Sequence, residues 1–206
     1  MARDTQSIVK MSRREGYALH PKAHKALVKR SGPPGQQSRN NFRSKTSQYS
    51  LQLREKQKVK RLYGLLERQF SNLMREASRG KDQAAGVALL QLLERRMDNA
   101  VYRAGFATSR RASRQLVTHG HFMLNGQRVD IPSIRLKVGD SLSLRPHSQQ
   151  TEYFKHLDDV SPAPPTIPEW LKVNRKKMEL QVSGLPTRED AEPDIKEQLI
   201  VEYYSR

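Results

Sequence analysis

The sequence contains no cysteine, which excludes disulfide bonds and zinc sites with cysteine ligands. Stability must therefore come from packing or from a bound partner. Residues 1–16 have no apolar core of the kind that a secretion signal needs, and no later run approaches the roughly 18 apolar residues of a membrane-spanning helix. We accordingly expect a soluble protein that is not exported and has no membrane partner.

Acidic residues are scarce beside basic ones. The 206 residues include 38 Lys and Arg against 21 Asp and Glu, which gives a formal net charge of +17. Residues 1–50 carry +9, residues 51–96 carry +6 and residues 97–145 carry +5, whereas residues 146–206 carry −3. This surplus predicts a polyanionic partner for the first three-quarters of the chain. The acidic last quarter must face something other than phosphate.

The sequence also lacks the motifs of common enzymes, including the phosphate-binding P-loop, the dinucleotide-binding glycine pattern and the nucleophile elbow of hydrolases. His119 and His121 are the only close pair of histidines, and no cysteine or carboxylate cluster accompanies them. Phosphate contact or turn packing is therefore favoured over metal binding for this pair. We expect no enzymatic activity, no cofactor and no metal.

Residues 109–144 combine a short helix, a tight hairpin and a closing strand. Residues 109–117 predict the helix, with one apolar side and one basic side. The apolar side is Ala112, Leu116 and Val117, and the basic side is Arg110, Arg111 and Arg114. Thr108 or Ser109 can cap its N-terminus, where free backbone N–H groups and the guanidinium groups favour an anion.

The hairpin and the alternation of apolar with polar residues predict a small antiparallel sheet. Asn125 and Gly126 are the pair best suited to the type I′ turn of a two-residue hairpin. The predicted strands are residues 122–124, 127–129, 134–138, 141–144, 170–173 and 178–182. The last two, joined by a basic loop, could extend the sheet begun at Phe122.

Apolar periodicity predicts helices in the rest of the chain. They span residues 51–79, 84–93, 94–106 and 195–204. The helix over residues 195–204 needs an apolar surface to pack against, and the helices over residues 51–79 and 84–93 supply one. Residues 148–168, with four prolines, predict a connection that contains a short helix.

Residues 1–50 are poor in large apolar side chains and rich in basic ones, so we expect this arm to be disordered in isolation. Two interpretations remain open. The arm is either a solvated basic tail or a segment that becomes ordered along a phosphate backbone.

Both DNA and RNA fit the charge. The arginine helix could enter the major groove of DNA, as recognition helices do. However, the chain has no dimerisation heptads, and its basic residues are spread over arm, helices and sheet. A surface that wide favours a folded RNA, which presents phosphates on several sides.

Seven motifs resemble the family of bacterial-type ribosomal small-subunit protein four, chloroplast members included. They are KMSRREG (10–16), PGQ (34–36), LQLREKQKVKRLYGLLERQF (51–70), LLQLLERRMDNAVYRAGF (89–106), RQLVTHGHFMLNGQRVDIPS (114–133), PEWL (168–171) and DIKEQLIVEYYSR (194–206). The middle stretch resembles the alpha-L RNA-binding motif. That motif also accompanies catalytic domains, for example in some pseudouridine synthases, but no catalytic motif is present here.

The resemblance implies an α+β fold in three parts. A basic arm covers residues 1–45, and a helical domain covers residues 46–92 and is completed by residues 184–206. The alpha-L domain, with helices and a small antiparallel sheet, is inserted between them over residues 93–183. The family implies a ribosome of the cytoplasm or of a plastid, and no homo-oligomer is expected.

The resemblance also implies partners. Family members bind the five-prime domain of small-subunit ribosomal RNA (rRNA) early in assembly, and they line the path by which messenger RNA enters the ribosome. They contact small-subunit protein five, an interface linked to decoding accuracy. Two alternatives remain: an RNA-modifying enzyme that reads RNA through the alpha-L motif, and an accessory assembly factor.

Three groups of residues carry these implied roles. The rRNA contacts are Arg13, Arg14, Lys56, Lys58, Arg61, Arg68, Arg110, Arg111, Arg114, His119 and His121. Arg39, Arg43 and Lys45 fall near the path of messenger RNA, and Leu199, Val201, Glu202 and Tyr203 fall near protein five. The chain departs from the family at residues 3–7 and 37–38, and Ser113 replaces a usual alanine.

Overall fold

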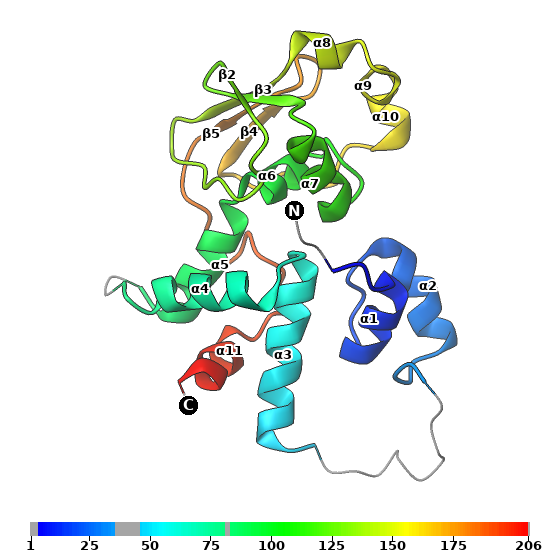
Figure 1. The fold of residues 1–206 in the computed structure, drawn as a ribbon, viewed down its shortest axis with the longest axis vertical. Coiled ribbons are helices and arrows are strands. Elements are labelled where there is room, and N and C mark those ends of the chain that lie inside the picture. Colours follow the sequence, from blue (N-terminus) through cyan, green and yellow to red (C-terminus); the bar gives the residue numbers. More distant parts are fainter. Residues whose placement is uncertain (1–3, 36–45, 81–82, 206) are drawn as a thin grey trace. The chain divides into compact units, whose positions relative to one another are not determined.

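The computed structural model describes residues 4–35, 46–80 and 83–205 (Figure 1). It combines helices with one antiparallel sheet, which confirms the α+β class. The chain forms two compact units, Met1–Ala88 with Asp194–Arg206, and Leu89–Pro193. Compactness alone does not define an independently folding domain, so the predicted boundaries at residues 46, 93 and 184 stay a prediction. None of the described helices is both long enough and apolar enough to cross a membrane.

The first unit is helical. Its helices are α1 (Ile8–Glu15), α2 (Pro21–Lys29), α3 (Gln48–Leu62), α4 (Glu67–Ala77) and α11 (Glu197–Tyr204), together with the start of α5 (Ala85–Glu94). The prediction of a single helix over residues 51–79 is wrong, because the chain turns at Gly64, whose φ of 65° is left-handed. The apolar spacing continues across this turn, since Val59 and Phe70 are both fully buried. The apolar periodicity of the sequence therefore did not reveal the break between α3 and α4.

The N-terminal segment is folded within the chain. Met11 of α1 and Ala23 of α2 are buried, and Glu15 forms ion pairs with Arg54 and Arg61 of α3. These contacts order residues that have too few apolar side chains to form a core by themselves. The predicted disorder concerns the isolated segment and stays a prediction.

The C-terminal helix packs against the predicted helical pair: it lies against α3 and α4, which occupy the stretch 51–79, and its Glu197 lies against Gly86 of α5. Ile200 of α11 is fully buried, and the Tyr204 ring lies 6.2 Å from that of Phe70 on α4. Glu202 accepts a hydrogen bond from Gln52 Nε2 of α3 at 2.7 Å. The two ends of the chain's sequence therefore contribute to one helical unit.

The second unit is built around a five-stranded antiparallel sheet of order β2-β1-β3-β5-β4. Its strands are β1 (Phe122–Leu124), β2 (Gln127–Val129), β3 (Ser141–Leu144), β4 (Leu171–Asn174) and β5 (Glu179–Val182). The hairpin turn lies at Asn125 and Gly126, both with positive φ, as predicted. The last two strands do extend the sheet, because β5 pairs with β3.

Three expectations for this unit need correction. Residues 134–138 form no strand and make only an isolated bridge between Arg135 and Arg96. The helix expected over residues 94–106 is α6 (Met97–Arg103), which begins after a break at Arg95 and Arg96. The connection after β3 contains three short helices, α8 (Pro146–Gln149), α9 (Glu152–Lys155) and α10 (Leu157–Val160).

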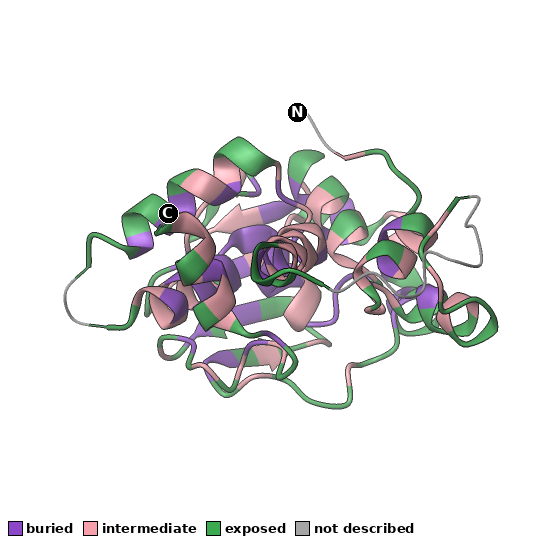
Figure 2. Ribbon diagram, turned by 90° about the horizontal axis from the view of Figure 1, so that it is seen from below, coloured by how far each residue is buried: buried purple, intermediate pink, exposed green. Residues whose placement is uncertain are grey.

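The core of the second unit lies on one face of the sheet. Phe122, Leu142 and Leu180 are each about 1% exposed and pack with apolar residues of α6 and of α7 (Arg110–Thr118). Buried positions alternate with exposed or half-buried ones along β3 and β5, and Figure 2 shows buried residues interspersed with more exposed ones along the strands. This alternation follows from the period of two along a strand and leaves the other sheet face polar.

Candidate nucleic-acid interface

Helix α7 begins as the sequence predicted but is rotated by about one residue. Ser109 is the N-cap, and its hydroxyl oxygen accepts a hydrogen bond from the Ala112 N–H at 3.2 Å. Ser113 and Val117 are fully buried, whereas Ala112 and Leu116 are half-buried. Ser113 faces inward because its hydroxyl donates to the backbone carbonyl of Asp98 on α6. A small polar residue had not been expected on that side.

Arg110 is bound within the protein. Its Nε donates to Asn99 Oδ1 at 2.8 Å, its Nη2 lies 3.1 Å from Glu192 Oε1, and its guanidinium lies 4.6 Å from the centroid of the Tyr102 ring. The side chain is only 11% exposed. Arg110 therefore joins α7 to α6 and to the segment before α11, which sequence spacing could not reveal.

The other two arginines of α7 differ in exposure. Arg114 is half-buried, and burial lowers the pKa of its guanidinium; nearby Asp98 opposes this shift and Arg96 adds to it. Arg111 is exposed. Of the predicted cationic face, Arg111 is thus the residue that most fully meets solvent.

The turn after α7 gathers basic groups around Gly120. His119 is exposed, and the His121 ring is held by a hydrogen bond of 3.0 Å between Nδ1 and Ser148 Oγ. Arg145 donates to the Gly120 carbonyl at 3.2 Å, and the Arg128 guanidinium lies over the same glycine. Sequence reasoning missed Arg128 and Arg145. Their only signal was their place in the sequence, since Arg128 lies on β2 and Arg145 directly follows β3.

Three of the predicted contacts in α3 are engaged inside the first unit. Lys56 is 3% exposed and lies 2.7 Å from Glu67 Oε1. Lys58 pairs with Glu55 at 2.7 Å and also donates to the Asp194 carbonyl. Arg61 pairs with Glu15, whose pKa is raised by burial even though Arg54 and Arg61 oppose that shift. Lys56 is buried, and Lys58 and Arg61 are half-buried and already paired with carboxylates, which argues against direct phosphate contact by these three cations.

The remaining predicted contacts of this unit fall into three groups. Arg13 donates to the carbonyls of Gly32 and Pro33 at 3.0 and 3.1 Å, so it holds the segment after α2. Arg14 and Arg68 are exposed. Arg39, Arg43 and Lys45 lie outside the described residues.

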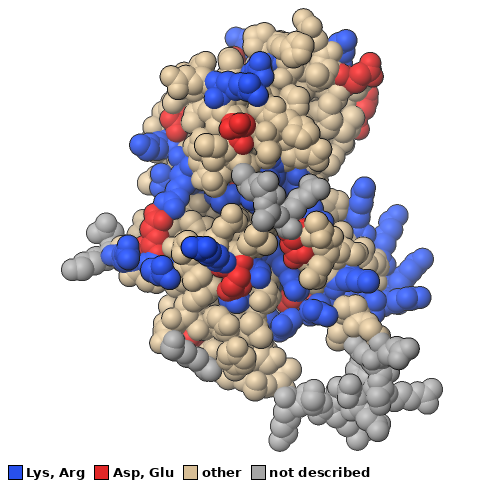
Figure 3. Space-filling model, viewed as in Figure 1, with Lys and Arg blue, Asp and Glu red and all other residues tan. Residues whose placement is uncertain are grey.

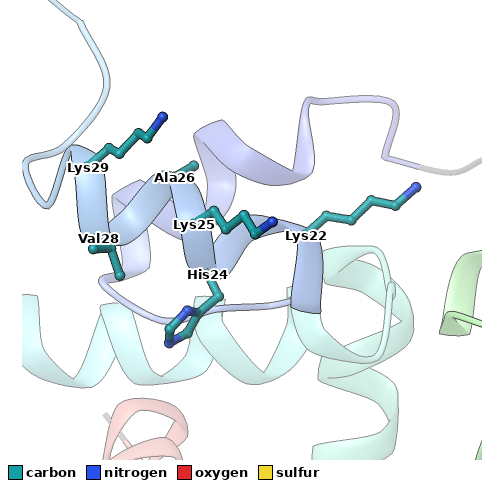
Figure 4. Close-up of a pocket in the computed structure, with 6 residues that line it drawn as sticks. All are labelled: Lys22, His24, Lys25, Ala26, Val28 and Lys29. Atoms are coloured by element: carbon teal, nitrogen blue, oxygen red, sulfur yellow. The ribbon is translucent and has the colours of Figure 1, made fainter.

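The exposed face of α2 is strongly basic, and the site residues predicted from the sequence do not include it. Lys and Arg side chains project together over α2 in Figure 3. A shallow hollow of about 470 Å³ is lined by Lys22, His24, Lys25, Ala26, Val28 and Lys29 (Figure 4). Its three lysines point away from the helix axis (Figure 4) and are exposed. The spacing of KAHKALVK carried this signal.

The four C-terminal residues assigned to a protein interface lie on α11. Leu199, Val201 and Tyr203 are half-buried, and Glu202 is exposed. The Tyr203 ring lies 5.7 Å from that of Tyr49. Among the described residues, no three His, Asp or Glu side chains are grouped in a way that could hold a metal ion.

Comparison with known proteins identifies the family. Residues 3–94 match the ribosomal protein S4/S9 N-terminal domain, and residues 95–142 match the S4 domain. Over the full length of both chains, the sequence is 50% identical to small ribosomal subunit protein uS4 of Chloroflexus aurantiacus. It is 47% identical to that of Roseiflexus castenholzii and 49% identical to that of Clostridioides difficile, again over all of each chain.

These comparisons confirm the resemblance inferred from the seven motifs. They also confirm the prediction of a protein that is not an enzyme, because the relatives are ribosomal proteins. The alternative of an RNA-modifying enzyme is therefore set aside. With matching domains and full-length identity near one half, the chain belongs to the uS4 family of small ribosomal subunit proteins.

Proposed function

We propose that this chain is a structural constituent of the small ribosomal subunit that binds the five-prime domain of its rRNA early in assembly. The observation that carries the proposal is the placement of exposed cations on several separate elements. Lys25 of α2, Arg68 of α4 and Arg111 of α7 are all exposed. A duplex groove is read mainly by one recognition helix, whereas a folded RNA offers phosphates in several directions and matches cations that are spread over separate elements.

The proposed contacts divide into direct and supporting residues. Arg14, Arg68, Arg111, His119 and His121 contact RNA, together with Lys22, Lys25 and Lys29. Arg13, Lys56, Lys58, Arg61, Arg110 and Arg114 instead position these elements through internal contacts. Phosphate contacts of this kind fix the register of the complex without reading its sequence.

The finer partners follow from the family resemblance. Leu199, Val201, Glu202 and Tyr203 contact small-subunit protein five and thereby influence decoding accuracy. Arg39, Arg43 and Lys45 lie along the path of messenger RNA. The negative charge of residues 146–206 supports a protein partner for the C-terminal helix. We propose a bacterial-type cytoplasmic ribosome, with a plastid ribosome as the alternative.

Salt dependence tests the RNA-binding function. We expect the logarithm of the affinity for five-prime-domain RNA to fall linearly with the logarithm of salt concentration, by a slope of about 0.7–0.9 for each phosphate contact. Replacing Lys22, Lys25 and Lys29 by Gln should reduce this slope by roughly 2–3. The matched control replaces Lys172, Lys176 and Lys177, three exposed lysines of the β4–β5 hairpin. An interaction that is insensitive to salt would contradict the proposal.

Stoichiometry separates a structural constituent from an accessory assembly factor. Purified small subunits should retain one copy of the chain after a high-salt wash. Quantitative mass spectrometry measures the ratio, and loss of the chain in the wash would favour the accessory factor.

A further inference from the structure

We propose that the turn at Gly120 is a binding site for one phosphate group of the RNA backbone, formed by His119, His121, Arg128 and Arg145. The identity of the anion as RNA rests on the proposed function. The existence of the anion site rests on the geometry of the turn itself.

Two guanidinium groups converge on the backbone of Gly120. A Cβ atom at this position would lie 2.8 Å from Arg128 Nε and 3.0 Å from Arg128 Nη2, so the guanidinium occupies the space of the missing side chain. Arg145 Nη1 donates to the Gly120 carbonyl at 3.2 Å. Gly120 also has a φ of 70°, which other residues rarely adopt. Glycine thus leaves the space that the Arg128 guanidinium occupies, while Arg145 reaches the carbonyl of the same residue.

The two histidines lie beside these arginines. Their ring centroids are 6.0 Å apart, and the backbone carbonyl of His121 accepts a hydrogen bond from the Arg145 N–H at 2.9 Å. The His121 ring is fixed by the bond from Nδ1 to Ser148 Oγ and by edge contact with Phe154, at 5.6 Å between centroids. Its Nε2 is then the nitrogen left to meet a ligand.

This cluster has no compensating carboxylate. Among the described residues, His119, His121, Arg128 and Arg145 take part in no ion pair with an acidic group. Other arginines of the same unit do so: Arg96 pairs with Asp98, Arg103 with Glu94 and Arg175 with Asp158. The second unit therefore pairs these three arginines with carboxylates and leaves the cluster around Gly120 without one.

Electrostatics makes an anion the matching ligand. Burial lowers the pKa of His121, and the nearby His119 and Arg145 lower it further, because like charges repel. A bound anion opposes this repulsion and favours the protonated imidazole of His121. A phosphate with several oxygens can accept from two guanidinium forks and from imidazole N–H groups at once. Because the phosphate belongs to the RNA backbone, this contact does not depend on the base sequence.

The Arg128→Gln variant of the full chain tests the site with RNA. The Arg128 side chain is exposed and makes no hydrogen bond to another described residue, so its replacement should leave the fold intact. Affinity for five-prime-domain RNA should fall about tenfold, and the salt slope should fall by about 1. Lys172→Gln is the matched control, because Lys172 is an exposed cation on β4, at the opposite edge of the sheet from β2. Wild-type affinity and slope in Arg128→Gln would overturn the inference.

Titration with inorganic phosphate separates this inference from the proposed function. In nuclear magnetic resonance spectra, the Gly120 amide and the His119 and His121 imidazoles should shift saturably in the wild type and not in Arg128→Gln. If the wild type failed to bind the RNA yet gave this response, the proposed function would fail and the anion site would stand. If phosphate produced no saturable shift, or the same shift in both proteins, the site would be refuted.

Discussion

The ammonium nitrogen of Lys56 lies 4.5 Å from the centroid of the Tyr203 ring. The same nitrogen lies 2.7 Å from a carboxylate oxygen of Glu67, which also accepts a hydrogen bond from the Tyr204 hydroxyl at 2.9 Å. One lysine of α3 is thereby joined to α4 and α11. Cation–π contacts gain strength when water is excluded, so this lysine stabilises the closure of the helical unit by the end of the chain.

Replacing Lys56 by Met should therefore weaken the helical unit. The apolar stem is preserved, but Glu67 loses one donor and Tyr203 loses its cation, so we expect a loss of about 1–3 kcal/mol in local stability. Hydrogen exchange of the α11 amides measures this change. Lys25→Met on α2 is the control, because Lys25 is exposed and should affect RNA affinity alone. Normal protection of α11 together with reduced RNA affinity in Lys56→Met would show that Lys56 is an RNA contact after all.

The Glu67 carboxylate should make the same unit sensitive to acid. Burial opposes ionisation of Glu67, but hydrogen bonds from Lys56, Lys60 and Tyr204 outweigh it and hold the pKa below its ordinary value of 4.5. Because the pKa is lower in the folded chain than in the unfolded chain, this contribution is complete above about pH 4.5 and is lost as the pH falls through the folded value. Its size is modest, since the Glu67 side chain is 48% exposed and solvent screens it.

Comparison with Glu67→Gln isolates this titration from that of other carboxylates. Hydrogen exchange of α11 should show a difference between wild type and variant at pH 6 that shrinks below pH 4.5. A difference that is constant over this range would mean that Glu67 does not contribute through its charge.

The sequence predicted the elements better than it predicted the state of their charges. The Asn125-Gly126 hairpin, the Ser109 cap and the packing of α11 each follow from local chemistry or from one apolar stripe. The turn at Gly64 was missed because the apolar spacing continues through it. The strand expected at residues 134–138 failed because alternation alone does not supply a pairing partner, and only Arg135 makes a bridge.

The candidate site shows where such reasoning stops. Glu192 is 82 residues beyond Arg110 in sequence, yet it neutralises that arginine. A helical wheel places Arg110 beside Arg111 on an outer face, but it cannot show that the distant Glu192 carboxylate engages Arg110. The same limit applies to Lys56 and Glu67. Because the sequence does not show which cations are paired with a carboxylate, it also could not single out Arg128 as an uncompensated one.

Arg110 and Arg111 should therefore respond differently to the same substitution. Arg111→Gln should lower RNA affinity and reduce the salt slope by about 1, with a smaller loss of stability than Arg110→Gln because Arg111 is exposed. Arg110→Gln should destabilise the second unit by about 1–3 kcal/mol, because Asn99 and Glu192 lose a buried donor. Joint replacement of Arg110 and Arg114 by Ala should weaken RNA binding without abolishing it.

Fluorescence of Trp170, the only tryptophan, follows urea unfolding of the second unit. Filter binding to five-prime-domain RNA follows affinity. Equal effects of Arg110→Gln and Arg111→Gln in both measurements would contradict the division into supporting and contacting arginines.

Gly105 should be intolerant of any side chain, because Arg175 and a proline close over it. Arg175 Nη1 donates to the Gly105 carbonyl at 2.7 Å, and Nη2 donates to the Ser161 carbonyl at 2.7 Å. A Cβ at residue 105 would lie 2.4 Å from Pro164 Cδ and 2.6 Å from Arg175 Nη1, and the φ of 76° adds backbone strain.

Gly139→Ala is a control for strain alone, since its φ is 93° and nothing lies within 4 Å of an added Cβ. We expect a loss of about 1–2 kcal/mol in Gly139→Ala and a clearly larger loss in Gly105→Ala, measured by urea unfolding with Trp170 fluorescence. Equal losses would show that the segment around Pro164 moves aside freely and that Arg175 does not fix it.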